Sequence, residues 1–348
     1  MDQTGPRVTT RNLHTIRLAV RNWLETYDEA WAGQNEIVIA MSGGGDSTAL
    51  CAAAALELPG RVRALTIDHG LQSGSDEVAA RAAQLARDLG CVTAEVLRVE
   101  VGNSGGLEAA ARQARYQALD QSRRGSPVLV AHTLDDQAET VLLGLARGSG
   151  ARSLAGMRAF APPWGRPLLG IRRSTTRAAC AEIGVTPHED PHNSDARFTR
   201  VRLRSEVLPL LEEVLGGGVA ESLARTAMQL QDDVVVLDAL AIELLHAART
   251  DRGLDTAVLS DAPAATRRRA IRFWLLDNGA RTATDGQLRA IDALVREWRG
   301  QGPVAVPNGG SGQGEGARLM VERRHGTLGI AVQLRHSVPG GRRIEKGT

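Results

Sequence analysis

The stretch Glu36-Ile-Val-Ile-Ala-Met-Ser-Gly-Gly-Gly-Asp-Ser47 joins a short apolar run to a glycine-rich turn. The apolar run predicts a buried β-strand over 36–41, and the alanine-rich segment after the turn predicts a helix. Three consecutive glycines let a ligand approach the backbone closely, and successive N–H groups at the start of a helix attract anions. The string at 42–47 therefore predicts a phosphate-binding loop at a strand–helix junction.

An alternative interpretation of this loop is a tight turn in which Ser42 or Asp46 only caps the helix. The phosphate-binding interpretation accounts for more of the residues at 42–47 than the capping interpretation does. The hydroxyls of Ser42 and Ser47 can donate to phosphate oxygens, and Asp46 can hold Mg²⁺ against them. We therefore favour phosphate binding.

Strands and helices alternate on both sides of the loop. Helical spacing is found over 12–32, 75–90, 106–124 and 135–147, and short apolar runs over 61–68, 92–99 and 127–132. This alternation predicts βαβ units and a parallel sheet covered on both faces. The expected fold class is α/β, with a parallel-sheet nucleotide-binding domain over residues 1–215.

The pattern changes after the three glycines at 216–218. Helical periodicity then predominates, which predicts a smaller, mostly helical domain over 219–332. Short β-like runs within 303–332 flank a glycine-rich stretch at 308–316, so this domain is expected to end in a β-hairpin. Residues 333–348 are predicted to form a flexible tail.

Composition excludes several classes of protein. The single lysine, Lys346, lies near the C-terminus, so a G-x-x-x-x-G-K-[ST] phosphate loop is impossible and Schiff-base chemistry at a buried lysine is implausible. Three cysteines without a C-x-x-C pair favour the reducing cytoplasm over a disulfide framework or a thiolate zinc site. The chain has no run of 18 apolar residues, so a membrane span is not expected. The formal net charge is only +2, so nucleic-acid binding would depend on local basic patches.

A second polar stretch, His132-Thr-Leu-Asp-Asp-Gln-Ala-Glu-Thr140, follows the fourth predicted strand. Ligands of open α/β sheets bind outside the carboxyl ends of the strands, where this stretch is expected to lie. On a helix, Asp135 and Glu139 share a face with Asp136 beside them, which suits a metal or a substrate ammonium group. The alternative is that these acids only complement the helix dipole.

These stretches carry a family resemblance. The loop at 42–47 resembles the pyrophosphate loop (PP-loop) of ATP pyrophosphatases, and the string at 132–140 is similar to that of tRNA(Ile)-lysidine synthetases. Further matching stretches lie at 106–116, 148–157, 166–169 and 189–204. The match runs in order over about residues 36–211, so a Rossmann-like PP-loop fold is expected there.

The resemblance implies an ATP-dependent ligase that joins L-lysine to C2 of the wobble cytidine of the isoleucine tRNA with a CAU anticodon. ATP first adenylates the cytosine, releasing pyrophosphate, and lysine then expels AMP to form lysidine. Three alternatives stay open at this point: a tRNA-thiolating PP-loop enzyme, an amide-forming ATP pyrophosphatase of small metabolites, and a nucleotide-binding sensor.

The residues expected to act divide by role. The ATP site comprises Ser42, Gly43, Gly44, Gly45, Asp46, Ser47 and His69, although His69 could instead be a polar strand end. Catalytic residues are Asp46, Asp136 (also the candidate base for the lysine amine) and Arg112, with Asp46 and Asp136 as Mg²⁺ ligands. The substrates are assigned to His132, Asp135, Asp136, Glu139, Arg112, Arg115, Arg152, Arg200, Arg202 and Arg204. From the residues alone, Arg112 can equally form a structural pair with Glu108.

Two arginine strips complete the expectations, one at 197–204 and one at 267–272. We expect both strips to lack compensating acids, which favours contacts with tRNA phosphates over a solvated face. In particular, we expect Arg267, Arg268 and Arg269 to contribute to tRNA binding.

Overall fold

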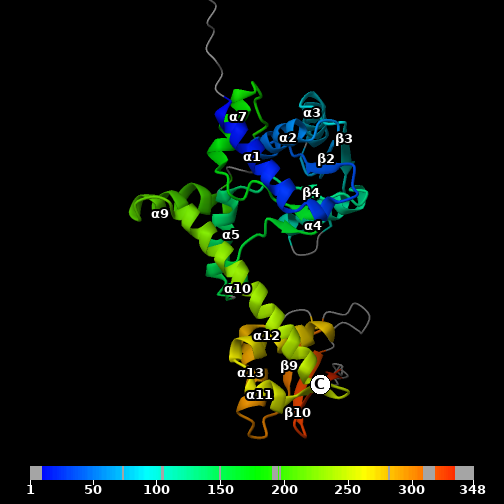
Figure 1. The fold of residues 1–348 in the computed structure, drawn as a ribbon, viewed down its shortest axis with the longest axis vertical. Helices are drawn as coiled ribbons and strands as arrows, with labels where there is room; N and C mark the ends of the chain where they lie inside the picture. The colour runs from blue at the N-terminus through cyan, green and yellow to red at the C-terminus, as the bar shows by residue number, and fades with distance from the viewer. Residues whose placement is uncertain are drawn as a thin grey trace, which may run out of the picture. The chain divides into compact units, whose positions relative to one another are not determined.

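The computed structural model describes residues 10–333 except 73, 103–105, 149, 190–194, 196, 281–282 and 309–317. Its contacts divide the chain into two compact units, Met1–Gln231 and Asp232–Thr348. The division falls within the long helix α10 (Val219–Ala248), labelled in Figure 1. The domain boundary expected at residues 216–218 stays a prediction, and the expected tail lies outside the described residues except for Gln333.

A six-stranded sheet, in the order β3-β2-β1-β4-β6-β5, organises the first unit. Its strands are β1 (Ile37–Ala40), β2 (Val62–Asp68), β3 (Thr93–Arg98), β4 (Val128–Leu129), β5 (Phe160–Ala161) and β6 (Trp164–Gly165). All neighbours are parallel except β5 and β6. The expected parallel α/β fold is therefore confirmed, with one short antiparallel strand at its edge.

Helices cover both faces of this sheet. The helices of this unit are α1 (Arg11–Thr26), α2 (Gly45–Glu57), α3 (Ser75–Asp88), α4 (Leu107–Ser122), α5 (Leu134–Ala146), α6 (Ala151–Leu154), α7 (Arg173–Glu182), α8 (Thr199–Arg202), the π-helical turn η3 (Leu203–Val207) and α9 (Leu208–Val214), with a 3-10 turn η1 (Asp28–Trp31). Successive side chains of β1 serve opposite faces: Ile37 and Ile39 pack in the cluster that includes α1, α2 and α3, whereas Val38 packs with Leu119 of α4. A strand buried on both sides explains the continuous apolar run in the sequence.

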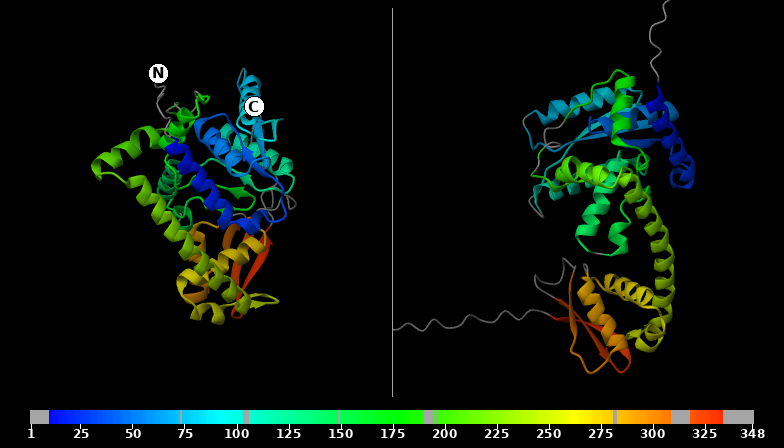
Figure 2. Two further views of the ribbon diagram at one scale, coloured as in Figure 1. Left: turned by 45° about the horizontal axis from the view of Figure 1, so that its top comes forward. Right: turned by 90° about the vertical axis from the view of Figure 1, so that its left-hand side faces the viewer.

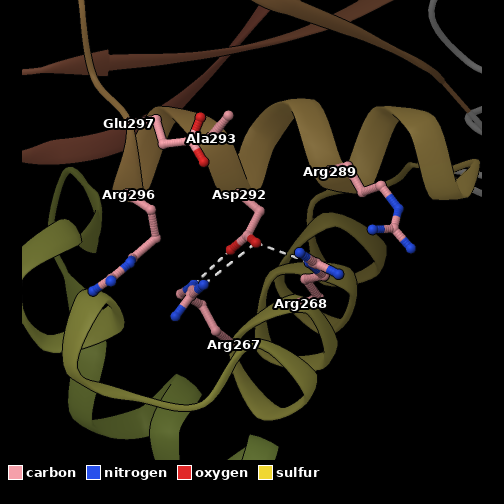
Figure 3. A pocket seen from close by; sticks show the side chains of 7 residues that line it. All are labelled: Arg267, Arg268, Arg289, Asp292, Ala293, Arg296 and Glu297. Atoms are coloured by element: carbon pink, nitrogen blue, oxygen red, sulfur yellow. Dashed lines mark hydrogen bonds and ion pairs between the residues drawn. The ribbon is translucent and has the colours of Figure 1, made fainter.

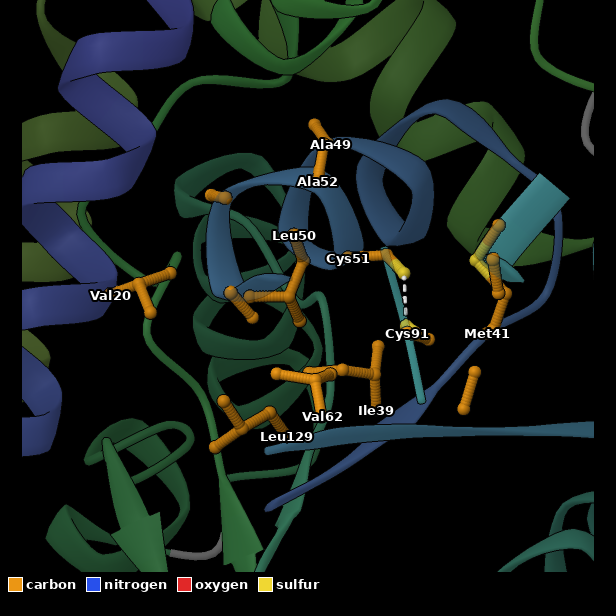
Figure 4. Packing of buried hydrophobic residues seen from close by; sticks show 14 of the residues in the cluster. Val20, Ile39, Met41, Ala49, Leu50, Cys51, Ala52, Val62, Cys91 and Leu129 are labelled. Atoms are coloured by element: carbon orange, nitrogen blue, oxygen red, sulfur yellow. Dashed lines mark hydrogen bonds between the residues drawn. The ribbon is translucent and has the colours of Figure 1, made fainter. Parts of the chain in front are cut away.

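The alanines of α2 let this helix pack closely on the sheet. Its residues from Ala49 to Ala55 are all buried (Figure 4). Within the same cluster the thiols of Cys51 and Cys91 meet at a sulfur–sulfur distance of 3.3 Å. Both cysteines, and Cys180, are buried free thiols, as expected for small core residues.

The second unit has its own core and its own sheet. Helices α11 (Thr256–Asp261), α12 (Ala264–Asp277) and α13 (Asp285–Arg296) lie on one side of an antiparallel sheet (Figure 2). The strand order is β7-β8-β11-β10-β9, formed by β7 (Arg249–Thr250), β8 (Gly253–Asp255), β9 (Val304–Pro307), β10 (Arg318–Arg324) and β11 (Thr327–Gln333). The expected terminal hairpin is present, but it belongs to a five-stranded sheet. The two- and three-residue strands β7 and β8 are too short to show periodicity.

No helix in the described part of the chain is both long enough and apolar enough to cross a membrane.

Candidate active site

The glycine-rich loop connects β1 to the first turn of α2. Gly43 has φ +82°, a conformation that favours glycine, and a Cβ added there would lie 3.1 Å from the Cβ of Ala82. The carbonyl of Gly43 accepts from the backbone N–H of His188 at 3.0 Å. Both strain and close packing therefore require glycine at this position of the loop.

The two serines of the loop bond to each other. The hydroxyls of Ser42 and Ser47 lie 3.0 Å apart, and the backbone N–H of Ser42 donates to Ser47 Oγ at 3.2 Å. Ser47 Oγ also donates to the carbonyl of Gly44 at 3.0 Å. These bonds hold the loop in a compact form next to the N-terminus of α2, where a phosphate would be favoured.

Asp46 is directed from the loop toward α7. Its Oδ2 accepts from Nε of Arg173 at 3.1 Å, and its Oδ1 accepts from the hydroxyl of Thr176. Burial raises the pKa of Asp46, although Arg173 and Thr176 oppose that rise. An ion pair thereby joins the glycine-rich loop to Arg173 of α7.

Asp136 serves as a helix cap and as an ion-pair partner. Its Oδ2 accepts from the backbone N–H and the hydroxyl of Thr133, both at 2.8 Å, within a capping box at the start of α5. Its Oδ1 lies 2.6 Å from Nη2 of Arg173. Burial works against ionisation, but Arg173 and Thr133 outweigh it, and the pKa of Asp136 is lowered. The cap and the charged contact therefore coexist in one side chain.

Glu139, one helical turn further along α5, is fully buried. Its Oε1 accepts from Nε of Arg204 at 2.8 Å and lies 3.7 Å from Nη1 of Arg173. Its Oε2 has no hydrogen-bond partner within the described part of the chain. Burial raises the pKa of Glu139, against the opposing effect of Arg204. One oxygen of a buried carboxylate is thus left without a partner among the described groups.

Arg173, the first residue of α7, connects all of these acids. Its guanidinium contacts Asp46, Asp136 and Glu139, and its backbone N–H donates to Asp135 Oδ2 at 2.8 Å. Asp135 therefore anchors the backbone at the start of α7. Glu139, expected on the same helix face, contacts the guanidinium groups of Arg173 and Arg204 instead. Sequence reasoning missed Arg173. The available signal was the Arg172-Arg173 pair shortly after the Arg-Pro-Leu-Leu stretch at 166–169.

A group of basic side chains lies beside the acids. Nε of Arg166 donates to Nδ1 of His132 at 3.2 Å, which places the proton of the neutral imidazole on Nε2. Burial chiefly, together with Arg166, Arg112 and Arg115, lowers the pKa of His132 to about 4 against the effect of Asp136. His132 is therefore neutral at pH 7, in a locally positive environment.

The expected arginines of α4 belong to this basic group. Burial is the main cause that lowers the pKa of Arg115, and the positive charge of Arg112 lowers it further. Tyr116 acts in the opposite direction. Arg112 donates to the hydroxyl of Tyr116 at 3.3 Å and lies over its ring. Burial and Arg115 lower the pKa of His69, whose Nδ1 is buried without a described partner. The side chain of Glu108 lies outside the described part, so its pairing with Arg112 stays a prediction.

The expectation that the 197–204 strip lacks compensating acids is wrong. The pairs are Arg197 with Asp195, Arg202 with Glu206 and Arg204 with Glu139. Arg204 lies on the π-helical turn η3, and it contacts Asp136 at 3.5 Å besides Glu139. Arg204 therefore lies at the acid cluster, that is, the carboxylates of Asp46, Asp136 and Glu139 that share Arg173. Arg202, in contrast, pairs on an exposed face. Arg200 is half-buried and Arg152 is exposed on α6.

The second strip differs from its expectation in the same way. Arg267 is 5% exposed and binds Asp292 of α13 through Nε at 2.5 Å. Arg268 shares that acid at 2.8 Å, and Arg269 lies 3.9 Å from Asp238. Acids 24 to 31 positions away in either direction supply the compensation, which local sequence cannot show. Arg267 is a structural residue, not a surface contact.

Residues 15–211 match the model of the PP-loop domain, and residues 254–328 match the model described as the TilS substrate binding domain. In fold, the chain also resembles the U34-tRNA thiolase NcsA from Methanococcus maripaludis, with a TM-score of 0.52, 16% identity and coverage of 64% of this chain and 80% of that one. The loop and the fold define an ATP-using enzyme of the PP-loop class.

Two relatives specify the family. The tRNA(Ile)-lysidine synthase of Nocardia farcinica is 62% identical over 320 residues, or 92% of this chain and 98% of the relative. That of Rhodococcus erythropolis is 57% identical over 329 residues, or 94% and 98%. The chain belongs to the tRNA(Ile)-lysidine synthase family.

Proposed function

We propose that this chain uses ATP to join L-lysine to C2 of the wobble cytidine of tRNA(Ile) with a CAU anticodon, forming lysidine in the cytoplasm. The observation that carries the proposal is 62% identity along nearly the whole length of a named lysidine synthase. The geometry supports it. Arg173 pairs both with Asp46 of the glycine-rich loop and with the buried Asp136, so the loop lies beside carboxylates that suit an amine substrate.

The reaction has two steps. The C2 oxygen of the cytosine attacks the α-phosphorus of ATP, and the bond to pyrophosphate breaks. An amino nitrogen of lysine then attacks C2, the C2–O bond breaks, and AMP leaves with its electron pair. The N–H groups around Gly44 and the N-terminus of α2 are suited to the charge that develops on pyrophosphate.

The acid cluster suits the lysine. Asp136 stays ionised, since its pKa is lowered, and its charge would hold the lysine ammonium. Glu139 has a raised pKa and an unpartnered Oε2. We therefore assign to Glu139 Oε2 the proton that the attacking amine loses, in preference to Asp136. The neighbouring Arg112, Arg115 and Arg166 would bind an anionic group of the substrates.

Mg²⁺ is expected to arrive with ATP. Among the described residues, no group of three or more His, Cys, Asp or Glu side chains is arranged to hold a metal ion. Asp46 and Asp136 both pair with Arg173, so they do not form a prepared metal centre. Mg²⁺ commonly binds through one or two carboxylates and the substrate phosphates, and Asp46 is the acid within the loop that fits this role. When bound, the ion would neutralise phosphate charge.

The cysteines argue against the thiolating alternative. Sulfur transfer needs a reactive thiolate, and such thiolates lie in exposed, electropositive surroundings. Cys51 and Cys91 are buried in the core. Burial, and then Asp46, raise the pKa of Cys180 to about 11. The substrate-binding segment at 254–328 also argues against a small-metabolite enzyme, which would not need it.

The nucleotide products test the reaction class. The full-length chain, supplied with ATP, L-lysine and unmodified tRNA(Ile), is expected to release AMP and pyrophosphate in equal amounts. Omitting the tRNA should abolish AMP release, because the tRNA carries the nucleophile of the first step. Chromatography of labelled ATP measures both results. Formation of ADP and phosphate, or AMP release that is independent of tRNA, would contradict the proposal.

A further inference from the structure

The second unit has a charged pocket between α12 and α13, with a volume of about 340 Å³ (Figure 3). Its charged lining consists of Arg267, Arg268, Arg289, Asp292, Arg296 and Glu297. Four arginines face two acids in the lining, and Asp285 pairs with Arg289 beside it, which leaves an excess of one positive charge. Ala293 is the remaining lining residue, so the pocket offers little apolar surface to a base or an aliphatic chain.

A buried ion pair forms the floor of this pocket. Arg267 binds Asp292 through Nε at 2.5 Å and Nη2 at 3.3 Å, and its Nη1 donates to the carbonyl of Ala262 at 2.6 Å. All three nitrogens of this guanidinium are therefore used within the protein. The pair fixes α12 against α13, and because Arg267 is only 5% exposed we assign it no contact with the ligand.

The other three arginines keep donors available. The hydrogen bonds that the structure gives them use Nε of Arg268 on Asp292 at 2.8 Å, Nε of Arg289 on Asp285 at 2.5 Å and Nη1 of Arg296 on the carbonyl of Ser260 at 3.0 Å. Each guanidinium has five N–H donors, so most of them are left for a ligand. Arg289 and Arg296 stand on either side of the central pair in Figure 3.

We propose that this pocket binds neighbouring phosphodiester groups of the tRNA backbone, one at each of Arg268, Arg289 and Arg296. The inference rests on the proposed function, and it assigns to this pocket a part of substrate binding. Guanidinium groups bind phosphate oxygens through paired N–H donors, and an excess of positive charge favours an anion. The pocket also lies wholly within the segment 254–328 that matches a substrate-binding domain.

The test is the salt dependence of tRNA binding by the full-length chain. The double variant Arg289→Gln/Arg296→Gln retains the Asp292 pairs, so its fold should be preserved. Each lost phosphate contact lowers the slope of log K against log salt by about 0.7 to 0.9, so the double variant should lose about 1.4 to 1.8. Its affinity at about 0.1 M salt should fall roughly fivefold or more per contact. Adding Arg268→Gln should lower the slope again.

The matched control is Arg318→Gln/Arg324→Gln, which removes the same charge from exposed positions on β10 of the same unit. We expect this control to keep most of the wild-type slope, and the pocket variants to keep wild-type ATP binding. An unchanged slope in the pocket variants, or an equal loss in the control, would overturn the pocket assignment. If wild-type protein makes no lysidine, the proposed function fails instead, whatever the slopes.

Discussion

Replacing Asp46 with Asn is expected to reduce tRNA-dependent AMP release on the order of a hundredfold or more. The substitution keeps the shape of the side chain and its ability to accept from Thr176. It removes the charge that pairs with Arg173 and that we propose as a ligand of the Mg²⁺ that accompanies ATP. Quenched-flow or steady-state measurement of AMP gives the rate.

Asp76→Asn provides the control for Asp46, because Asp76 is an exposed acid in the first turn of α3. It removes the same charge from another helix start and should leave the rate unchanged. Near-normal turnover by folded Asp46→Asn protein would remove the glycine-rich loop from the ATP site.

Replacing Arg173 with Gln is expected to affect both stability and activity. Asp46, Asp136 and Glu139 would lose their shared cation, and leaving buried charges without a partner costs about 3 kcal/mol or more of unfolding free energy. Lysidine formation should fall with it, because the loop would lose its connection to the acid cluster. Arg173→Lys retains the charge and should recover part of the stability, but less of the activity, since one ammonium cannot reach three acids.

The destabilisation by Arg173→Gln should depend on pH in a defined direction. Arg173 helps to lower the pKa of Asp136, so its contribution is present above the ordinary carboxylate range and is lost as the pH falls through the lowered pKa. The difference between wild type and variant should therefore be largest at pH 7 and smaller at about pH 3, below the ordinary aspartate range. Urea denaturation at both pH values measures it, with Arg81→Gln on α3 as an exposed control. A difference that grows on acidification would contradict the ion-pair account.

The main architecture of the first unit was predictable because it depends on local patterns. The apolar run of β1 and the turn at 42–47 are contiguous, and parallel topology follows from alternating periods. Topology alone also predicts that the acids after β4 lie near the loop after β1, since β1 and β4 are neighbours in the sheet. The structure brings these two segments together through Arg173.

The ion pairs of the acid cluster and of the 267–269 run were not predictable, because their members are far apart in the sequence. The pairs Arg197–Asp195 and Arg202–Glu206 are local and could have been read from the sequence. Asp46 and Arg173 are separated by 127 positions, and Arg267 and Asp292 by 25. No helical or strand period relates such positions, so arginine runs looked uncompensated when read along the chain. The dual role of Asp136 was also hidden, because a helix cap and a ligand use the same residue type at the same place.

The most direct test of the account is mass spectrometry of nucleosides from tRNA(Ile) after incubation with the full-length chain, ATP and L-lysine. The account predicts that the wobble cytidine is lost and that a nucleoside heavier by lysine minus water appears, with nitrogen label from lysine retained in it. A sulfur-containing nucleoside, or unmodified cytidine despite AMP release, would contradict it.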